Sequence, residues 1–233
     1  IKMKLGIFGG TFNPPHLGHV KAALMFYDTV GLDKLLIMPT FQPPHKEIKG
    51  GDDPYLRFEL TKTAFSTEDI GERNIEVSDY EIKAGGKSYT YQTLTHFKNE
   101  DTTLYLLCGS DMFITLDCWR NSEIIFSLAN IVCQRRENDD DTGLIIKRKA
   151  EEYRERFNSD VIFCNAPPIE ISSTELRDMI KSYSDTSLYL DKKSLEFIIN
   201  HGMYSSHAAY ERIYNGIKDI VGKRIEHVME CMK

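Results

Sequence analysis

The stretch from residue 9 to residue 19, Gly-Gly-Thr-Phe-Asn-Pro-Pro-His-Leu-Gly-His, constrains this chain more than any other. It follows a short apolar run at 5–8, typical of a buried strand, and precedes residues 20–30, whose apolar spacing is typical of a helix. Glycine lets a backbone approach a ligand closely because it has no Cβ. The N–H groups and the positive dipole end of a helix attract anionic oxygens. The stretch therefore predicts a phosphate site at the first turn from strand to helix.

Two histidines, His16 and His19, lie at the predicted helix entrance, and their spacing can bring both imidazoles to one side of it. A lone histidine near a helix start is more often a capping or surface residue. Paired histidines, with two glycines ahead and two prolines before the first histidine, favour a functional role instead. The pattern is neither the G-x-G-x-x-G of dinucleotide dehydrogenases nor the G-x-x-x-x-G-K-[ST] of P-loop enzymes.

The spelling of this stretch resembles the T/S-x-x-H/H-x-G-H signature of nucleotidyltransferases and is most similar to the bacterial nicotinate-nucleotide adenylyltransferase family. A second stretch, residues 169–177, resembles the I-S-S-T-x-[IL]-R element that closes on the ATP phosphates in that family. Read from its residues alone, this second stretch is a helix start with hydroxyl caps and an acid in the first turn. The occurrence of both motifs in the family's order favours the nucleotide interpretation.

The predicted fold class is α/β, a Rossmann-like doubly wound parallel sheet with flanking helices and a C-terminal helical extension. Further strands are expected at 33–39, 75–78, 102–108, 129–134 and 161–164, with helices at 54–66, 142–157 and 191–200. A strand, a helix and a strand at the start of the chain form a βαβ unit, which implies parallel strands and right-handed crossovers. We expect a nucleotidyltransferase domain over 1–204 and the helical extension over 205–233.

ATP-binding residues are expected at the carboxyl ends of the strands, where ligands bind in open α/β sheets. Asp111 follows such a strand end and can bond ribose hydroxyls or cap the next helix. The resemblance implies catalytic roles for His16, His19 and Arg177. It implies ATP contacts from Gly9, Gly10, Thr11, Phe12, His16, His19, Gly109, Asp111, Ile171, Ser172, Ser173 and Arg177.

The resemblance also implies a mononucleotide site formed by Asn13, His45, Lys46, Tyr89, Thr90 and Trp119. The residues alone leave several of these positions open. Lys46 can bind phosphate or lie solvated on the surface, and Thr90 can serve as a helix N-cap. Arg57 is more readily interpreted as a surface residue of its helix, although relatives hold an arginine there. Arg135 and Arg136 follow a strand and can face nucleotide phosphates.

The implied reaction is attack of the 5′-phosphate of nicotinate mononucleotide on the α-phosphorus of ATP. It yields nicotinate adenine dinucleotide and pyrophosphate, a step of NAD biosynthesis. A phosphate monoester is already a nucleophile, so catalysis reduces to in-line positioning and charge neutralisation. Mg²⁺ is expected through the ATP phosphates, with no metal site in the protein. The alternatives are an enzyme that prefers nicotinamide mononucleotide and a non-catalytic nucleotide-binding regulatory module.

Composition narrows the class of protein. A chain of 233 residues with 41% hydrophobic residues fits one globular domain with an appendage. A net charge of −6 argues against a nucleic-acid partner. No apolar run is long enough for a membrane span and no signal peptide opens the chain, so we expect a cytoplasmic enzyme with small-molecule partners. Five cysteines without C-x-x-C spacing argue against a disulfide framework or a zinc site. The sequence does not decide whether the chain forms a homo-oligomer.

The tail carries its own pattern. Apolar residues recur at helical spacing from residue 210 to Met232, interrupted at Gly222. Residues 224–227, Arg-Ile-Glu-His, are similar to the opening of an HD-domain phosphohydrolase, in which His227 would be the first metal ligand. That role holds only if such a domain continues beyond Lys233, because the later ligands are missing from this sequence. A C-terminal helix that packs on the domain or on a second subunit is an equal interpretation.

Overall fold

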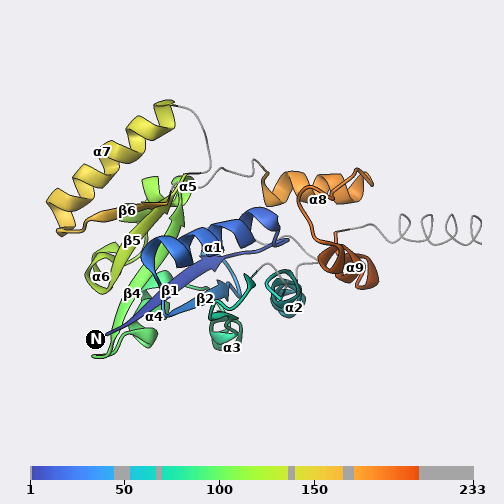
Figure 1. Ribbon diagram of the computed structural model, residues 1–233, viewed down its shortest axis with the longest axis horizontal. Helices are drawn as coiled ribbons and strands as arrows, with labels where there is room; N and C mark the ends of the chain where they lie inside the picture. Colours follow the sequence, from blue (N-terminus) through green and yellow to red (C-terminus); the bar gives the residue numbers. More distant parts are fainter. Residues whose placement is uncertain (1, 45–52, 67–69, 136–139, 165–170, 205–233) are drawn as a thin grey trace, which may run out of the picture.

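The computed structural model describes residues 2–44, 53–66, 70–135, 140–164 and 171–204 (Figure 1). These residues form one sheet of six strands in the order β3-β2-β1-β4-β5-β6, and each neighbouring pair is parallel. This order is that of a doubly wound sheet, in which the direction of winding reverses between β1 and β4. The predicted α/β fold class is confirmed. The strands are β1 Met3–Gly10, β2 Lys34–Pro39, β3 Ile75–Val77, β4 Thr102–Gly109, β5 Ala129–Gln134 and β6 Val161–Cys164.

Helices cover both faces of the sheet. They are α1 Leu17–Val30, α2 Pro54–Ala64, α3 Tyr80–Ala84, α4 Thr90–Phe97, α5 Ser110–Ile114, α6 Ser122–Leu128, α7 Asp140–Phe157, α8 Ser173–Lys181 and α9 Lys192–Asn200, with a 3₁₀ turn η2 at Leu116–Cys118. Successive strand residues point to opposite faces. Leu36 therefore packs into the cluster that contains Leu94 and Phe126, whereas Ile37 packs into the cluster that contains Phe26 of α1. None of the described helices is both long enough and apolar enough to cross a membrane.

A third cluster joins helices that are distant in sequence. Leu60 of α2, Leu176 of α8 and Ile198 of α9 are buried together, and the Leu17 N–H donates to the Tyr189 carbonyl over 2.8 Å. Figure 1 shows these three helices beyond the carboxyl ends of β1 and β2. The C-terminal part of the described chain thus returns to the end of the sheet at which ligands bind in this architecture.

The structure corrects several sequence expectations. Helix α1 begins at Leu17 rather than at residue 20, because His16 has an extended backbone and occupies the N-cap position. Asp111 does not cap α5, whose N-cap is Gly109, and Thr90 lies inside α4, whose N-cap is Tyr89. The short helix α3 was not expected, since five residues carry too little periodicity to mark a helix. The expected extension 205–233, with His227, and the loop residues His45, Lys46 and Arg136 lie outside the described residues.

Candidate active site

A cavity of about 1290 Å³ lies at the carboxyl ends of β1 and β4, where the winding of the sheet reverses. Pockets for one small ligand usually hold roughly 300–1,000 Å³, so this cavity has room for two substrates. It brings together all of the predicted ATP and mononucleotide residues that the structure describes. These are Gly9, Gly10, Thr11, Phe12, Asn13, His16, His19, Tyr89, Thr90, Gly109, Asp111, Trp119, Ile171, Ser172, Ser173 and Arg177.

The turn after β1 approaches the cavity with its main chain. A Cβ on Gly9 would meet nothing within 4 Å, whereas a Cβ on Gly10 would lie 3.0 Å from the Phe12 ring. Phe12 adopts a positive φ of 49°, which turns its ring inward until the side chain is only 2% exposed. The ring packs edge-on against Phe8 and against His19, with centroid separations of 5.4 and 5.0 Å. The aromatic ring of Phe12 therefore supports the imidazole of His19.

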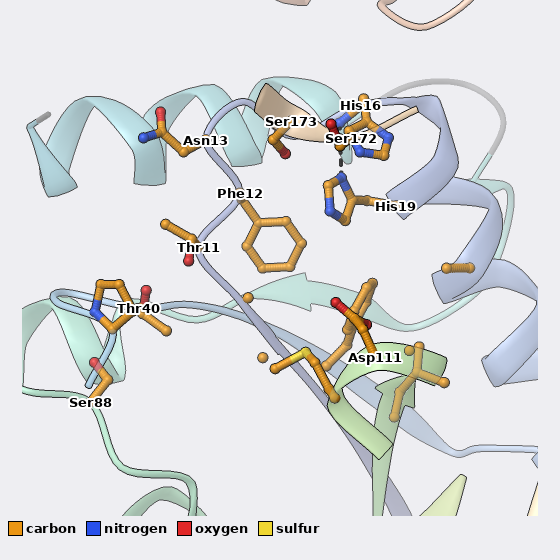
Figure 2. Close-up of a pocket in the computed structure, with 18 of the residues that line it drawn as sticks. Thr11, Phe12, Asn13, His16, His19, Thr40, Ser88, Asp111, Ser172 and Ser173 are labelled. Atoms are coloured by element: carbon orange, nitrogen blue, oxygen red, sulfur yellow. Dashed lines mark hydrogen bonds between the residues drawn. The ribbon is translucent and has the colours of Figure 1, made fainter. Parts of the chain in front are cut away.

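The two histidines are in contact at the start of α1, and their ring centroids are 3.7 Å apart. The His16 main-chain N–H donates to Nδ1 of His19 over 3.2 Å (Figure 2). A ring nitrogen that accepts a hydrogen bond carries no proton, so the proton of a neutral His19 is on Nε2. His19 lines the cavity, and this tautomer gives it an N–H donor suited to a phosphate oxygen.

A buried arginine that the sequence interpretation assigned to the surface holds the turn in place. The Arg57 side chain is on α2, and the residue is 0% exposed. Its Nη1 donates to the carbonyls of Thr11 and Thr40, each at 2.8 Å, and its Nη2 donates to the Phe41 carbonyl at 2.9 Å. The guanidinium thus joins the carboxyl ends of β1 and β2. The surface expectation was wrong because the carbonyl partners lie 16 to 46 residues away in sequence.

The N-terminus of α8 docks on the same turn. Arg177 Nη1 donates to the Asn13 carbonyl over 2.6 Å, and Ser173 Oγ donates to the Pro14 carbonyl over 3.1 Å. Ser172 is the N-cap of α8 and forms a capping box with Glu175, as the hydroxyl and the acid in the first turn predicted. The two sequence motifs are therefore in direct contact across more than 150 positions.

The end of β4 contributes an acceptor to the opposite side of the cavity. Asp111 is an exposed residue in the first turn of α5, and Figure 2 shows its carboxylate directed toward the side that carries Phe12 and His19. Asp111 does not cap α5, whose N-cap is Gly109, and the hydroxyl-binding role of its carboxylate stays a prediction. A carboxylate at a strand end is typical of a group that accepts from ribose hydroxyls.

Tyr89, Arg120 and Trp119 line another part of the cavity. Arg120 Nη1 donates to the Tyr89 hydroxyl over 3.3 Å, and its guanidinium carbon lies 4.9 Å from the centre of the Tyr89 ring. Trp119 is partly buried and packs against the core. Planar side chains in such a place can stack on an aromatic ligand ring.

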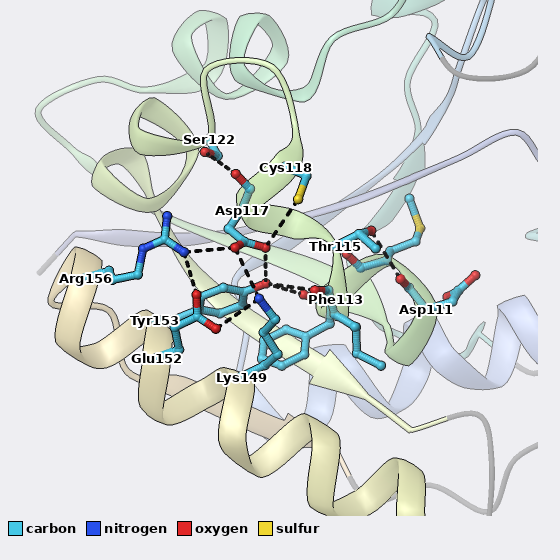
Figure 3. A network of polar contacts seen from close by, with 12 residues as sticks. Asp111, Phe113, Thr115, Asp117, Cys118, Ser122, Lys149, Glu152, Tyr153 and Arg156 are labelled. Atoms are coloured by element: carbon cyan, nitrogen blue, oxygen red, sulfur yellow. Dashed lines mark hydrogen bonds and ion pairs between the residues drawn. The ribbon is translucent and has the colours of Figure 1, made fainter.

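An ion network outside the cavity supports this aromatic segment (Figure 3). Asp117 of η2 accepts from Lys149 Nζ at 3.2 Å, from Arg156 Nη1 at 2.9 Å and from the Tyr153 hydroxyl at 3.2 Å, all on α7. The Tyr153 hydroxyl also lies 2.7 Å from the Phe113 carbonyl. Helix α7 is thus bonded both to α5, through the Phe113 carbonyl, and to η2, through Asp117.

Opposing effects set the ionisation of Asp117. Burial alone would raise its pKa, but hydrogen bonds from Lys149 and Arg156 outweigh burial, so the pKa lies below its usual range. Asp117 is ionised at neutral pH for this reason. Because Trp119 follows only two residues later, the network fixes the backbone from which this ring projects. Nothing in the local sequence around Asp117 indicated these partners.

Among the described residues, no group of three or more His, Cys, Asp and Glu side chains is arranged to hold a metal ion. The cationic and donor groups of the cavity include Arg, Lys, His, hydroxyl and main-chain N–H groups. This set is suited to binding anions.

Comparison with known proteins gives one consistent answer. The family model "Cytidylyltransferase-like" matches residues 7–179. A Clostridium novyi protein named "Probable nicotinate-nucleotide adenylyltransferase" is 37% identical over 203 residues, which cover 86% of this chain and 98% of that protein. A Clostridium tetani protein of the same name is 36% identical over 204 residues with the same coverage.

Solved structures agree on the fold. A Plasmodium falciparum nicotinic acid mononucleotide adenylyltransferase complexed with NaAD superposes with a TM-score of 0.68 at 18% identity. The match covers 87% of this chain and 97% of that one. At this level of identity, the similarity establishes the shared architecture.

Proposed function

The chain belongs to the cytidylyltransferase-like family and, within it, to the nicotinate-nucleotide adenylyltransferases, and from this premise we propose its reaction and the roles of its residues. It transfers the adenylyl group of ATP to nicotinate mononucleotide. The products are nicotinate adenine dinucleotide and pyrophosphate, in a step of NAD biosynthesis. One structural observation carries the assignment of the site. The turn that precedes His16 and the N-terminus of α8 meet at one cavity, where Arg177 donates to the Asn13 carbonyl and Ser173 donates to the Pro14 carbonyl.

The ATP phosphates bind between the two motifs. The N-terminus of α1 and the Nε2–H of His19 supply donors on one side, and α8 supplies its helix dipole and Arg177 on the other. Arg177 has five N–H donors and commits only part of them to Asn13 and Thr174, so it can also bind a phosphate oxygen. These groups stabilise the charge that grows on the α-phosphoryl group and on the departing pyrophosphate.

The mononucleotide binds on the side formed by Tyr89, Thr90 and Trp119, and its ring stacks on an aromatic side chain. Its phosphate needs no general base because it is already an anionic nucleophile. The protein contributes position: the incoming phosphate must approach the α-phosphorus in line with the leaving pyrophosphate. Asn13 lies at the turn between the two substrate regions, and we assign His45 and Lys46, which lie outside the described residues, as further phosphate partners.

We assign Mg²⁺ to the substrate rather than to the protein. Mg²⁺ usually keeps several waters and binds substrate phosphates together with few protein ligands. We also place the reaction in the cytoplasm, which fits the observation that the described cysteines Cys108, Cys118, Cys133 and Cys164 form no disulfide with one another.

Pyrophosphate release with ATP and Mg²⁺ tests the function directly, with nicotinate mononucleotide, nicotinamide mononucleotide and phosphopantetheine as acceptors. We expect turnover with the nicotinate acceptor. His19→Ala should lower kcat/KM by about 10²–10³-fold, the usual cost of removing one donor to a developing charge. His96→Ala is the matched control, because His96 is an exposed histidine of α4 that stacks on Tyr80 away from the cavity.

The control should keep its kcat/KM within about twofold of the wild-type value, as surface substitutions usually do. If the wild-type protein releases no pyrophosphate with any mononucleotide, the proposed reaction is wrong. If turnover is normal but His19→Ala matches His96→Ala, the reaction stands and the role of His19 is refuted.

A further inference from the structure

We propose that Glu81 is a positioning residue for the mononucleotide side of the cavity, where its buried carboxyl group holds Ser88 and Thr93 on either side of Tyr89 and Thr90. The inference rests on the proposed function, which places the mononucleotide against Tyr89 and Thr90. Glu81 is on α3, the helix that the sequence did not predict, and no step of the reaction uses it.

The carboxyl group of Glu81 lies almost entirely out of solvent at the wall of the cavity. The residue is 7% exposed and belongs to the cavity lining. Its Oε1 accepts a hydrogen bond of 2.6 Å from the Thr93 hydroxyl, whereas Oε2 is buried without a hydrogen-bond partner among the described residues. Leaving a buried carboxyl oxygen unsatisfied is costly. Packing alone therefore does not explain why a carboxyl group occupies this position.

Ser88 connects the carboxyl group to the loop after β2. The Ser88 oxygen accepts from the Phe41 N–H over 3.0 Å, and the Ser88 hydroxyl lies near the Glu81 carboxyl group, where it acts to lower the pKa of that group. The Ser88 N–H in turn donates to the Gln42 carbonyl over 2.9 Å. Figure 2 shows Ser88 beside Thr40, at the same edge of the cavity. The side chain of Glu81 thus joins α3 to the two backbone segments that form this wall.

Thr93 connects the same carboxyl group to α4. Its main-chain N–H bonds to the Tyr89 carbonyl, and its hydroxyl points at Glu81. Tyr89 and Thr90 therefore lie in sequence between Thr93, whose hydroxyl bonds to the carboxyl group, and Ser88, whose hydroxyl lies near it. Burial raises the pKa of Glu81, and the Thr93 and Ser88 hydroxyl groups oppose that rise. The geometry predicts that loosening either contact shifts the Tyr89–Thr90 segment relative to the mononucleotide.

The test compares Michaelis constants for the two substrates. Glu81→Met keeps about the length of the side chain but removes both carboxyl oxygens, including the acceptor for the Thr93 hydroxyl. We expect the KM for nicotinate mononucleotide to rise about tenfold, as for the loss of one hydrogen bond to a charged group, while the KM for ATP stays within about twofold. Thr93→Val removes the other end of the same bond and should give the same split between the two KM values.

Thr95→Val is the matched control on α4, because the Thr95 hydroxyl donates only to the Tyr91 carbonyl over 2.7 Å at an exposed position. It should leave both KM values unchanged. The double variant Glu81→Met/Thr93→Val should be no worse than the poorer single variant, since both remove the same hydrogen bond. A melting temperature of Glu81→Met within about 3 °C of the wild-type value would separate positioning from general destabilisation.

Several results would overturn the proposal: equal rises in both KM values, additive effects in the double variant, or a Glu81→Met variant that behaves like Thr95→Val. Wild-type protein that does not use nicotinate mononucleotide would refute the proposed function itself. Normal wild-type turnover with unchanged variants would refute only the role of Glu81.

Discussion

The two sides of the cavity are held by different chemistry. The turn that contains Asn13 and leads into α1 is held by Arg57, Arg177 and Ser173. All three side chains donate to main-chain carbonyl oxygens. The segment that carries Trp119 is instead held through one carboxylate, Asp117, by side chains of α7 (Figure 3).

This difference has a functional consequence. Main-chain carbonyls do not titrate, so the contacts that Arg57, Arg177 and Ser173 make to the phosphate-binding turn should not depend on the protonation of these acceptors. The aromatic segment depends on a group that loses its charge in acid and whose partners are screened by salt. We therefore expect these carbonyl contacts to persist in acid, where the contacts of Asp117 weaken.

Arg57→Met should disrupt the phosphate-binding turn and have the largest effect on the free energy of unfolding. It removes the donors to three carbonyl oxygens in the interior, and unsatisfied buried polar groups cost about 1–3 kcal/mol each. We expect a loss of about 3 kcal/mol or more in the free energy of unfolding. For a chain of this size, that corresponds to a fall of about 10 °C in melting temperature, measurable by circular dichroism.

Arg57→Lys tests whether the geometry of the guanidinium matters beyond its charge. A single ammonium cannot reproduce the planar fork that bonds to Thr11, Thr40 and Phe41, so this variant should lie between the wild type and Arg57→Met. A melting temperature of Arg57→Met close to the wild-type value would show that the three carbonyl contacts do not hold the turn.

Asp117→Asn should weaken the second side by a smaller amount, about 1–2 kcal/mol in the free energy of unfolding. Asp117 itself is 9% exposed, but Lys149 is 25% and Arg156 50% exposed, so solvent screens part of the attraction. The KM for the mononucleotide should rise more than the KM for ATP, because Trp119 lies on the weakened segment. A larger effect on the KM for ATP would contradict the division between the two sides.

The contribution of Asp117 to the stability of the fold should depend on pH. The folded protein holds the pKa of Asp117 below its value in the unfolded chain, which is about 3.9. The ionised carboxylate therefore stabilises the fold above that value, and this contribution is lost as the pH falls through the folded pKa. The difference in melting temperature between wild type and Asp117→Asn should be complete above about pH 5 and should shrink below about pH 4.

The sequence predicted those parts of the site whose residues lie close together along the chain. The turn with His16 and His19 is one uninterrupted motif, and Ser172 with Glu175 forms a capping box within four residues. The parallel α/β sheet also followed from the alternation of apolar runs and helices. Local spacing contains this information because backbone conformation and helix capping are local properties.

The parts that could not be predicted depend on partners far away in the chain. Arg57 is one charged residue on a helix, and only the folded structure shows that it faces three carbonyls rather than solvent. The partners of Asp117 on α7 are 32 to 39 residues away, and those of Glu81 belong to a loop and a helix beyond a glycine turn. A charged residue in sequence does not reveal whether an opposing group will meet it in the interior.

The smallest predicted effect is that of Asp28→Asn. It compares an exposed carboxylate that is bonded to arginine with the largely buried carboxylate of Asp117. Asp28 accepts two hydrogen bonds from Arg73, at 2.8 and 2.7 Å, and these are as short as any made by Asp117. Its side chain is 51% exposed, however, and exposed ion pairs contribute little. We expect Asp28→Asn to change the melting temperature by less than about 2 °C and to leave both KM values unchanged. If Asp28→Asn cost as much as Asp117→Asn, hydrogen-bond geometry alone would account for the network, and the burial of Asp117 would not explain how α7 supports the aromatic side of the cavity.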